Sequence, residues 1–250
     1  MEKEQVFNKY SKYYNLLYSD KNYSAESEYI NKLLASHGQA CGKVLELGCG
    51  TGGHARFLAQ KGYIIHGIEQ SSAMVKQAKL CDNFSCEQGD ICSFSISEKY
   101  DAVIALFHVI SYQTTNQKLN AVFFNASRHL VDGGIFVFDF WFTPAVCSKG
   151  PEVRVKRMQG EGIEIIRIAE PDIHPALNQI DVKYSIFVRD INLNTVEIIN
   201  ETHNMRHFSL TEIDLLCDKH GFYRVYAKEM MTSRSPSNDT WGICVVLKKK

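Results

Sequence analysis

A glycine-rich segment at residues 46–53, Glu-Leu-Gly-Cys-Gly-Thr-Gly-Gly, is the strongest chemical signal in the sequence. It follows a short apolar run, and glycines after a buried strand let the backbone approach a ligand at the carboxyl edge of a sheet. The spacing Gly48-x-Gly50-x-x-Gly53 also satisfies the dinucleotide fingerprint, in which the next helix holds a pyrophosphate. The motif alone therefore leaves the nature of the cofactor open.

Carboxylates stand at or near the ends of three successive apolar runs. Glu46 lies two residues before the first glycine, where it could help to hold the ammonium group of a bound amino acid. Glu69 ends the second run, at the usual spacing for an acid that bonds ribose hydroxyls. Residues 88–91, Gln-Gly-Asp-Ile, follow the third run and offer an acid to an adenine amino group. Met74 could pack on the adenine ring or in the core.

Two side chains that can move a proton, His108 and Tyr112, follow the predicted fourth strand. The carboxyl end of a strand is where α/β enzymes place their chemistry, so we predict a site role for both. His54 falls in the first turn of a helix and is predicted to be structural. His203 and His207 are four residues apart and would suggest a metal only on a helix. No metal site is predicted.

The elements that carry these residues alternate between strand and helix. Strands are predicted at 43–48, 64–69, 84–88, 101–106 and 135–140. Ser71 or Ser72 can cap the helix after the second strand, and a further helix runs from about Asn116 to Leu130, stopped by Gly133-Gly134. This order predicts an α/β fold with a Rossmann-like, doubly wound and mostly parallel sheet.

From residue 151 to 208 the hydrophobic period changes to two. The stretch 180–186, Ile-Asp-Val-Lys-Tyr-Ser-Ile, predicts one of three or four antiparallel strands with one wet face. Ser209-Leu-Thr-Glu212 is then the capping box of a helix that ends at Gly221, and strands at 222–231 and 241–248 follow. We therefore predict a core of residues 1–150 and 209–250, with an antiparallel β insertion at 151–208.

Composition argues against several classes of protein. The 28 Lys and Arg residues balance 28 Asp and Glu residues, so a nucleic-acid partner is not indicated. No apolar stretch reaches the roughly 20 residues of a membrane helix, and residues 1–5 lack the order of a signal peptide. The eight scattered cysteines include no CxxC pair and indicate a reducing compartment. We expect a cytoplasmic protein.

The glycine motif, the acid that ends the second strand and the Gly-Asp pair resemble, in order and spacing, those of the class I S-adenosylmethionine-dependent methyltransferases. The resemblance covers about residues 43–141 and implies S-adenosylmethionine as the cofactor. The candidate cofactor-binding residues are Tyr14, Tyr23, Glu46, Gly48, Cys49, Gly50, Glu69, Gln70, Met74, Gly89, Asp90, Ile91 and Leu106. The candidate catalytic residues are His108 and Tyr112.

Further segments resemble the sugar N,N-dimethyltransferases that act on nucleotide-linked amino sugars. Residues 14–23 are similar to the N-terminal segment that closes over the cofactor in that family, and residues 106–112 to its active-site loop. Residues 139–144 resemble its Trp-rich exit from the fifth strand, and residues 201–208 also match. The loop at 236–241 differs, because the family often has an arginine there, and some relatives have His in place of Tyr112.

This resemblance implies N-methylation of an amino sugar or similar amine by a homodimer. Two alternatives stay open on the sequence: an O-methyltransferase of a small hydroxylated metabolite, and a non-catalytic S-adenosylmethionine-binding protein. An NAD-dependent oxidoreductase is disfavoured by Gly89-Asp90 and by the lack of a Tyr-x-x-x-Lys set. The expected partner is a small-molecule acceptor, and the N-terminal segment and the insertion are expected to close its pocket.

Overall fold

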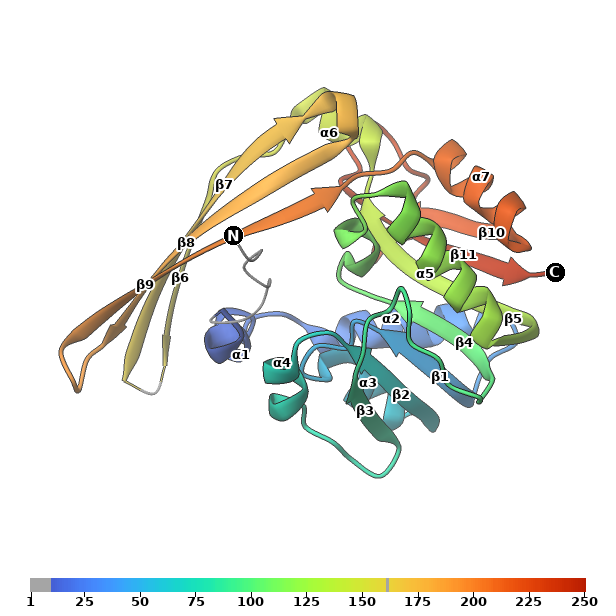
Figure 1. Cartoon of the computed structure of the whole chain (residues 1–250), viewed down its shortest axis with the longest axis horizontal. Helices are drawn as coiled ribbons and strands as arrows, with labels where there is room; N and C mark the ends of the chain where they lie inside the picture. Colours follow the sequence, from blue (N-terminus) through green and yellow to red (C-terminus); the bar gives the residue numbers. More distant parts are fainter. Residues whose placement is uncertain (1–9, 161) are drawn as a thin grey trace.

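A seven-stranded sheet flanked by helices forms the core of the computed structural model, which describes residues 10–160 and 162–250 (Figure 1). Its strands are β1 (Gly42–Leu47), β2 (Tyr63–Glu69), β3 (Phe84–Gln88), β4 (Tyr100–Ala105), β5 (Leu130–Trp141), β10 (Phe222–Glu229) and β11 (Gly242–Lys249). The α-helices are α1 (Tyr14–Leu17), α2 (Tyr23–Ser36), α3 (Gly53–Ala59), α4 (Ser72–Gln77), α5 (Asn116–His129), α6 (Thr143–Lys149) and α7 (Leu210–His220). The prediction about residues 1–5 lies outside the described residues.

The strand order of this sheet is β10-β11-β5-β4-β1-β2-β3. Strands β1 to β5 are parallel, and β11 runs antiparallel to both β5 and β10. The order reverses at β1, which pairs with β2 on one side and β4 on the other. A reversal of this kind opens a crevice at the carboxyl ends of the strands. The predicted doubly wound, mostly parallel α/β sheet is confirmed.

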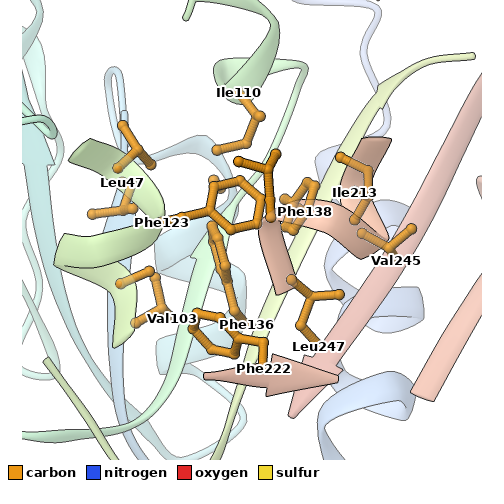
Figure 2. Close-up of a cluster of buried hydrophobic side chains, with 14 of the residues drawn as sticks. Leu47, Val103, Ile110, Phe123, Phe136, Phe138, Ile213, Phe222, Val245 and Leu247 are labelled. Carbon is orange, nitrogen blue, oxygen red and sulfur yellow. The ribbon is translucent and has the colours of Figure 1, made fainter. Parts of the chain in front are cut away.

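Apolar side chains cover both faces of the sheet, as buried parallel strands require. Helices α5 and α7 pack on one face, and α2 and α3 pack on the other. Phe123 of α5 lies at the centre of the first cluster, with its ring 5.6 Å from the rings of Phe136 and Phe138 (Figure 2). The apolar side chains packed on the two faces of the sheet hold the strand ends, and hence the candidate site residues, in fixed positions.

The predicted helix ends are confirmed, but the residue that ends one helix differs from the prediction. Ser71 Oγ accepts a hydrogen bond from the Met74 amide and caps α4, and the left-handed Gly221 ends α7. Helix α5 ends at His129, within one residue of the predicted Leu130, but Gly133-Gly134 do not end it. The buried His129 ring bonds Asn125 O and accepts from the Ile96 amide, so it closes the helix end itself. The chain then passes directly into β5.

Helices α2 and α6 are absent from the sequence-based prediction. Asn22 Oδ1 accepts from the Ala25 amide at the start of α2, which is a regular N-cap. Pro144 lies in the first turn of α6, where its missing N–H carries no cost. Among the described residues, no helix is long and apolar enough to cross a membrane.

The segment after α6 forms a second, antiparallel sheet that extends away from the core (Figure 1). Its strands are β6 (Arg154–Gly160), β7 (Ile163–His174), β8 (Gln179–Asp190) and β9 (Thr195–Arg206), in that order. The antiparallel strands predicted within 151–208 are confirmed. The inner face of this sheet buries Ile165, Ile186 and Ile199 against the N-terminal segment, defined here as residues 10–23. The division into a core and an insertion domain stays a prediction.

The contrast between Phe123 and its neighbour Phe124 gives a test of the core. Phe123 is fully buried, whereas Phe124 on the same helix is 57% exposed. Phe123→Ala should lower the free energy of unfolding by about 3–5 kcal/mol, because it leaves a cavity among aromatic rings. Phe124→Ala should change it by less than about 0.5 kcal/mol. Denaturant unfolding of the two variants measures the difference, and equal effects would contradict the placement of α5.

Candidate functional site

The loop between β1 and α3 folds over the end of β2. The Gly48 amide donates to Ile68 O at 2.7 Å, and the Gly50 amide donates to Glu69 Oε2 at 2.9 Å. Gly48 and Gly50 have φ of 68° and 56°, a conformation that favours glycine. A side chain on Gly50 would meet no atom within 4 Å, so the space above its backbone is open. The loop therefore fits a ligand that approaches the backbone closely.

Glu46, at the end of β1, is a buried acid without a matching donor. Its side chain is 2% exposed, and among the described residues Oε2 has no hydrogen-bond partner. Burial, reinforced by the nearby Glu69, raises the pKa of Glu46 to about 8. A cation placed beside Oε2 would restore the carboxylate. The amino group of an amino acid supplies such a cation, so Glu46 fits the role predicted for it.

Glu69, at the end of β2, holds two loops together. Its Oε1 accepts from the Ser71 amide at 2.8 Å while its Oε2 accepts from Gly50. Burial raises the pKa of Glu69, and the backbone amides oppose this shift. A carboxylate has about four lone-pair positions, so two amides leave room for the hydroxyls of a ribose.

The Gly-Asp segment after β3 lies beside the end of β2. The Gly89 amide donates to Glu69 O, and Gln88 Nε2 donates to the carbonyl of the exposed Gln70. Asp90 is exposed and uses Oδ1 to accept from the Cys92 amide. The remaining predicted neighbours, Cys49, Ile91 and Leu106, are buried. The structure therefore brings the candidate cofactor residues of β1, β2 and β3 to one edge.

The N-terminal segment lies against this edge. Thr51 Oγ1 donates to Asn15 Oδ1 at 2.9 Å, and the Tyr14 and Tyr23 hydroxyls share a hydrogen bond. Burial raises the pKa of Tyr23 to about 12, so its hydroxyl stays protonated. Met74 packs in the cluster that joins this segment to the insertion. That contact matches the core-packing alternative for Met74.

A pocket of about 200 Å³ opens between the N-terminal segment and the glycine loop. Three cations, Lys21, Arg56 and Lys79, are among its lining residues, and none of those residues is an acid. The others are Asn15, Tyr18, Ser19, Tyr23 and Thr51. The pocket therefore suits an anionic or strongly polar group next to the candidate cofactor site.

His108 follows β4 and faces β5. Its backbone is left-handed, with φ of 63°, and its Nδ1 lies 2.7 Å from Asp139 Oδ2. Burial alone would raise the pKa of Asp139, but the facing His108 outweighs burial and holds that pKa below its ordinary value. The ring also lies 5.7 Å from the Trp141 ring. His108 is therefore an oriented imidazole beside an ionised acid.

Tyr112 faces the insertion instead of Asp139. Its hydroxyl lies 2.9 Å from His203 Nδ1, and His203 Nε2 lies 3.3 Å from Glu201 Oε2. His203 and Glu201 are both buried, on β9. Burial lowers the pKa of His203 and raises that of Tyr112 well above its ordinary value. The three side chains form a buried hydrogen-bonded chain.

His108 and Tyr112 thus have different partners, although Trp141 packs near both. Asp139, Glu201 and His203 lie in the segments 139–144 and 201–208, for which the sequence indicates a family resemblance but no catalytic role. No sequence signal pairs them with His108 or Tyr112, because only the placement of β5 and β9 in the fold brings these side chains together. His203 lies on a strand and not on a helix, and His207 bonds Thr143 Oγ1. That geometry separates the two histidines considered as a metal pair.

Comparison with known proteins shows which proteins the chain is similar to. Residues 44–134 match the model of the methyltransferase domain. A dTDP-3-amino-3,4,6-trideoxy-α-D-glucopyranose N,N-dimethyltransferase of Streptomyces venezuelae is 30% identical over 140 residues, which are 55% of this chain and 59% of that protein. The chain is therefore similar to S-adenosylmethionine-dependent methyltransferases.

Two further proteins extend the similarity along the chain. A dTDP-3-amino-3,6-dideoxy-α-D-glucopyranose N,N-dimethyltransferase of Streptomyces fradiae is 24% identical over 76% of the chain and 73% of its own length. An S-adenosylmethionine-bound amino pentose methyltransferase of Micromonospora echinaspora superposes with a TM-score of 0.77 at 20% identity, over 100% of both chains. That structure shares the fold, including the insertion.

The double role of Glu69 generates a prediction about cofactor binding. Glu69→Ala should weaken S-adenosylhomocysteine binding by about 1.5–3 kcal/mol, because charge-assisted hydrogen bonds to the ribose and to the glycine loop are lost. Glu87→Ala on the neighbouring strand, where the side chain is 57% exposed, is the control and should bind normally. Isothermal titration calorimetry measures both variants. Tight NAD binding without S-adenosylmethionine binding would contradict the assignment of this edge.

Proposed function

We propose that this methyltransferase transfers a methyl group from S-adenosylmethionine to the amine nitrogen of an amino sugar or similar small amine. The observation that carries the proposal is the Tyr112–His203–Glu201 chain beside an edge that fits the cofactor. The activities of the Streptomyces relatives support it. Burial lowers the pKa of His203, so its imidazole is a neutral base that can take a proton from the acceptor nitrogen through Tyr112.

The proposed residues position two reactants and exclude water. When bound, S-adenosylmethionine supplies an electrophilic methyl group on a sulfonium. Glu46 and Glu69 would hold its amino-acid and ribose ends, while the residues after β4 would face the acceptor. Holding an acceptor in line with the methyl group is proximity catalysis. The aromatic N-terminal segment and the inner face of the insertion would close the site.

The proton of the amine has a defined route in this proposal. His203 Nε2–H donates to Glu201 Oε2, which leaves the lone pair of Nδ1 to accept from the Tyr112 hydroxyl. An acceptor N–H directed at the Tyr112 oxygen can then pass its proton there as the phenol proton moves to Nδ1. The Tyr10 amide donates to Glu201 Oε1 and fixes the end of the chain. A second methylation needs the same step, because the first leaves a protonated secondary amine.

Removal of the Tyr112 hydroxyl tests this route. Tyr112→Phe should lower turnover by about 100-fold, because the amine loses its proton acceptor, and should leave cofactor affinity within about twofold. Tyr223→Phe, at a 44% exposed tyrosine on β10, is the control. Transfer of a labelled methyl group to an amino sugar, with the matching hydroxy sugar as a second acceptor, measures turnover. Methylation of only the hydroxy sugar, or unchanged turnover in Tyr112→Phe, would defeat the proposal.

We also propose that the protein is a homodimer formed through the outer face of the insertion. Ile166, Phe187 and Ile198 lie in one row across β7, β8 and β9, and Ile166 and Ile198 are 39% and 57% exposed. Val155 and Val196 extend the exposed apolar face. A contiguous apolar face of this kind marks an interaction site, and a face that pairs with itself suits a twofold axis.

Charge introduced on this face tests the dimer. Ile198→Glu should give a monomer by light scattering, because two buried carboxylates would meet across the axis. Thr202→Glu, on the same face of β9 but outside the apolar row, should leave the mass unchanged. A monomeric unsubstituted protein would contradict the dimer without affecting the proposed chemistry.

Finally, we propose that the protein works in the cytoplasm. All eight cysteines lie in the described residues, and each is a free thiol. Three of them are exposed, which suits a compartment that keeps thiols reduced. Labelling of the exposed thiols in intact cells would test this placement.

A further inference from the structure

A charged network that the proposed mechanism does not use lies beneath the glycine loop. Lys21 Nζ donates to Glu26 Oε2 at 2.6 Å, and His54 Nε2 lies 2.7 Å from the same oxygen. The side chains of Lys21, Glu26 and His54 are 11%, 20% and 7% exposed, respectively. Burial alone would raise the pKa of Glu26, but its bonds with His54 and Lys21 outweigh burial and lower it. Glu26 is therefore a carboxylate, and His54 Nε2 carries a proton that it donates to Glu26.

The other nitrogen of His54 faces the buried acid at the end of β1. His54 Nδ1 lies 3.9 Å from Glu46 Oε1, which is too long for a hydrogen bond but within the range of an electrostatic contact. The Tyr23 ring packs edge-on against His54 at 5.0 Å and limits rotation of the imidazole. The network thus fixes His54 at Glu46, whose second oxygen has no partner among the described residues.

We propose that His54 is a positioning residue for Glu46, and that Glu26 and Lys21 hold it so that Glu46 recognises the ammonium end of the cofactor. The inference rests on the cofactor assignment of the proposed function. Lys21 lies in the turn between α1 and α2, so the network also ties the N-terminal segment to this recognition.

The groups around Glu46 define how its charge responds to pH. Glu69, Cys86, Cys49 and Tyr23 interact with it from β2, β3, the glycine loop and α2. Of these and His54, only His54 can carry a positive charge. Without ligand, Glu46 is protonated below about pH 8, and a bound ammonium favours the ionised form. Affinity for a ligand with an ammonium group should therefore rise as pH increases toward 8, with release of a proton.

Two ligands separate recognition of the ammonium from recognition of the nucleoside. S-adenosylhomocysteine carries the amino-acid end, whereas 5′-deoxy-5′-methylthioadenosine keeps the adenine, ribose and sulfur without it. Calorimetry of the full chain with both ligands at pH 6 and pH 8 reports affinity and proton release. The test variants are His54→Asn and Glu26→Gln. Glu28→Gln is the control, because Glu28 lies on the same helix in exposed pairs with Lys32 and Lys61.

We expect His54→Asn to weaken S-adenosylhomocysteine binding about tenfold, and Glu26→Gln about threefold, with nucleoside binding within twofold of the unsubstituted protein. Glu28→Gln should match the unsubstituted protein for both ligands. Equal losses for both ligands, or unchanged S-adenosylhomocysteine affinity at both pH values, would overturn the inference. If His54→Asn does not fold, Glu26→Gln decides alone. An unsubstituted protein that binds neither ligand would overturn the cofactor assignment itself.

Discussion

The Glu69 carboxylate is the interaction on which the rest of the site depends. Parallel strands end in loops whose amides have no strand to pair with, and a buried amide without a partner is costly. Glu69 accepts from the amides of Gly50 and Ser71, and its own carbonyl accepts from Gly89. One residue therefore holds three loops at the carboxyl edge. The spacing of the glycine motif and the Gly-Asp pair follows from these bonds.

The buried acids of the site differ in charge because they differ in partners. Asp139 Oδ2 lies 2.7 Å from His108 Nδ1, and Asp139 is ionised. Glu46 Oε2 has no hydrogen-bond partner among the described residues, and Glu46 holds a proton near neutral pH. Glu201 accepts from a backbone amide and lies beside His203. A proton donor, a proton acceptor and a cation site can thus coexist within one edge. The arrangement suits chemistry in which a charged cofactor meets a neutral acceptor.

Much of the fold could be predicted from the sequence because its signals are local. The glycine turn, the apolar runs and the period-two stretch at 180–186 each specify their own element, and all three appear in the structure. The end of α5 was predicted to within one residue but for the wrong reason, because a buried His129 closes the helix in place of the glycines. The hydrogen-bond partner of Tyr112 also could not be predicted from the sequence. His203 lies 91 residues away, and only the docking of β9 brings it to Tyr112.

The N-terminal segment connects these parts, because it contacts both the insertion and the glycine loop. Arg167 of β7 donates to the hydroxyls of Tyr10 and Tyr18, and Asn15 accepts from Thr51 on the other side. Glu46 Oε2 is fully buried, so an ammonium could meet that oxygen only if neighbouring atoms move. In the proposed function, closure of the segment would therefore accompany occupation of the site and would exclude water from the pocket.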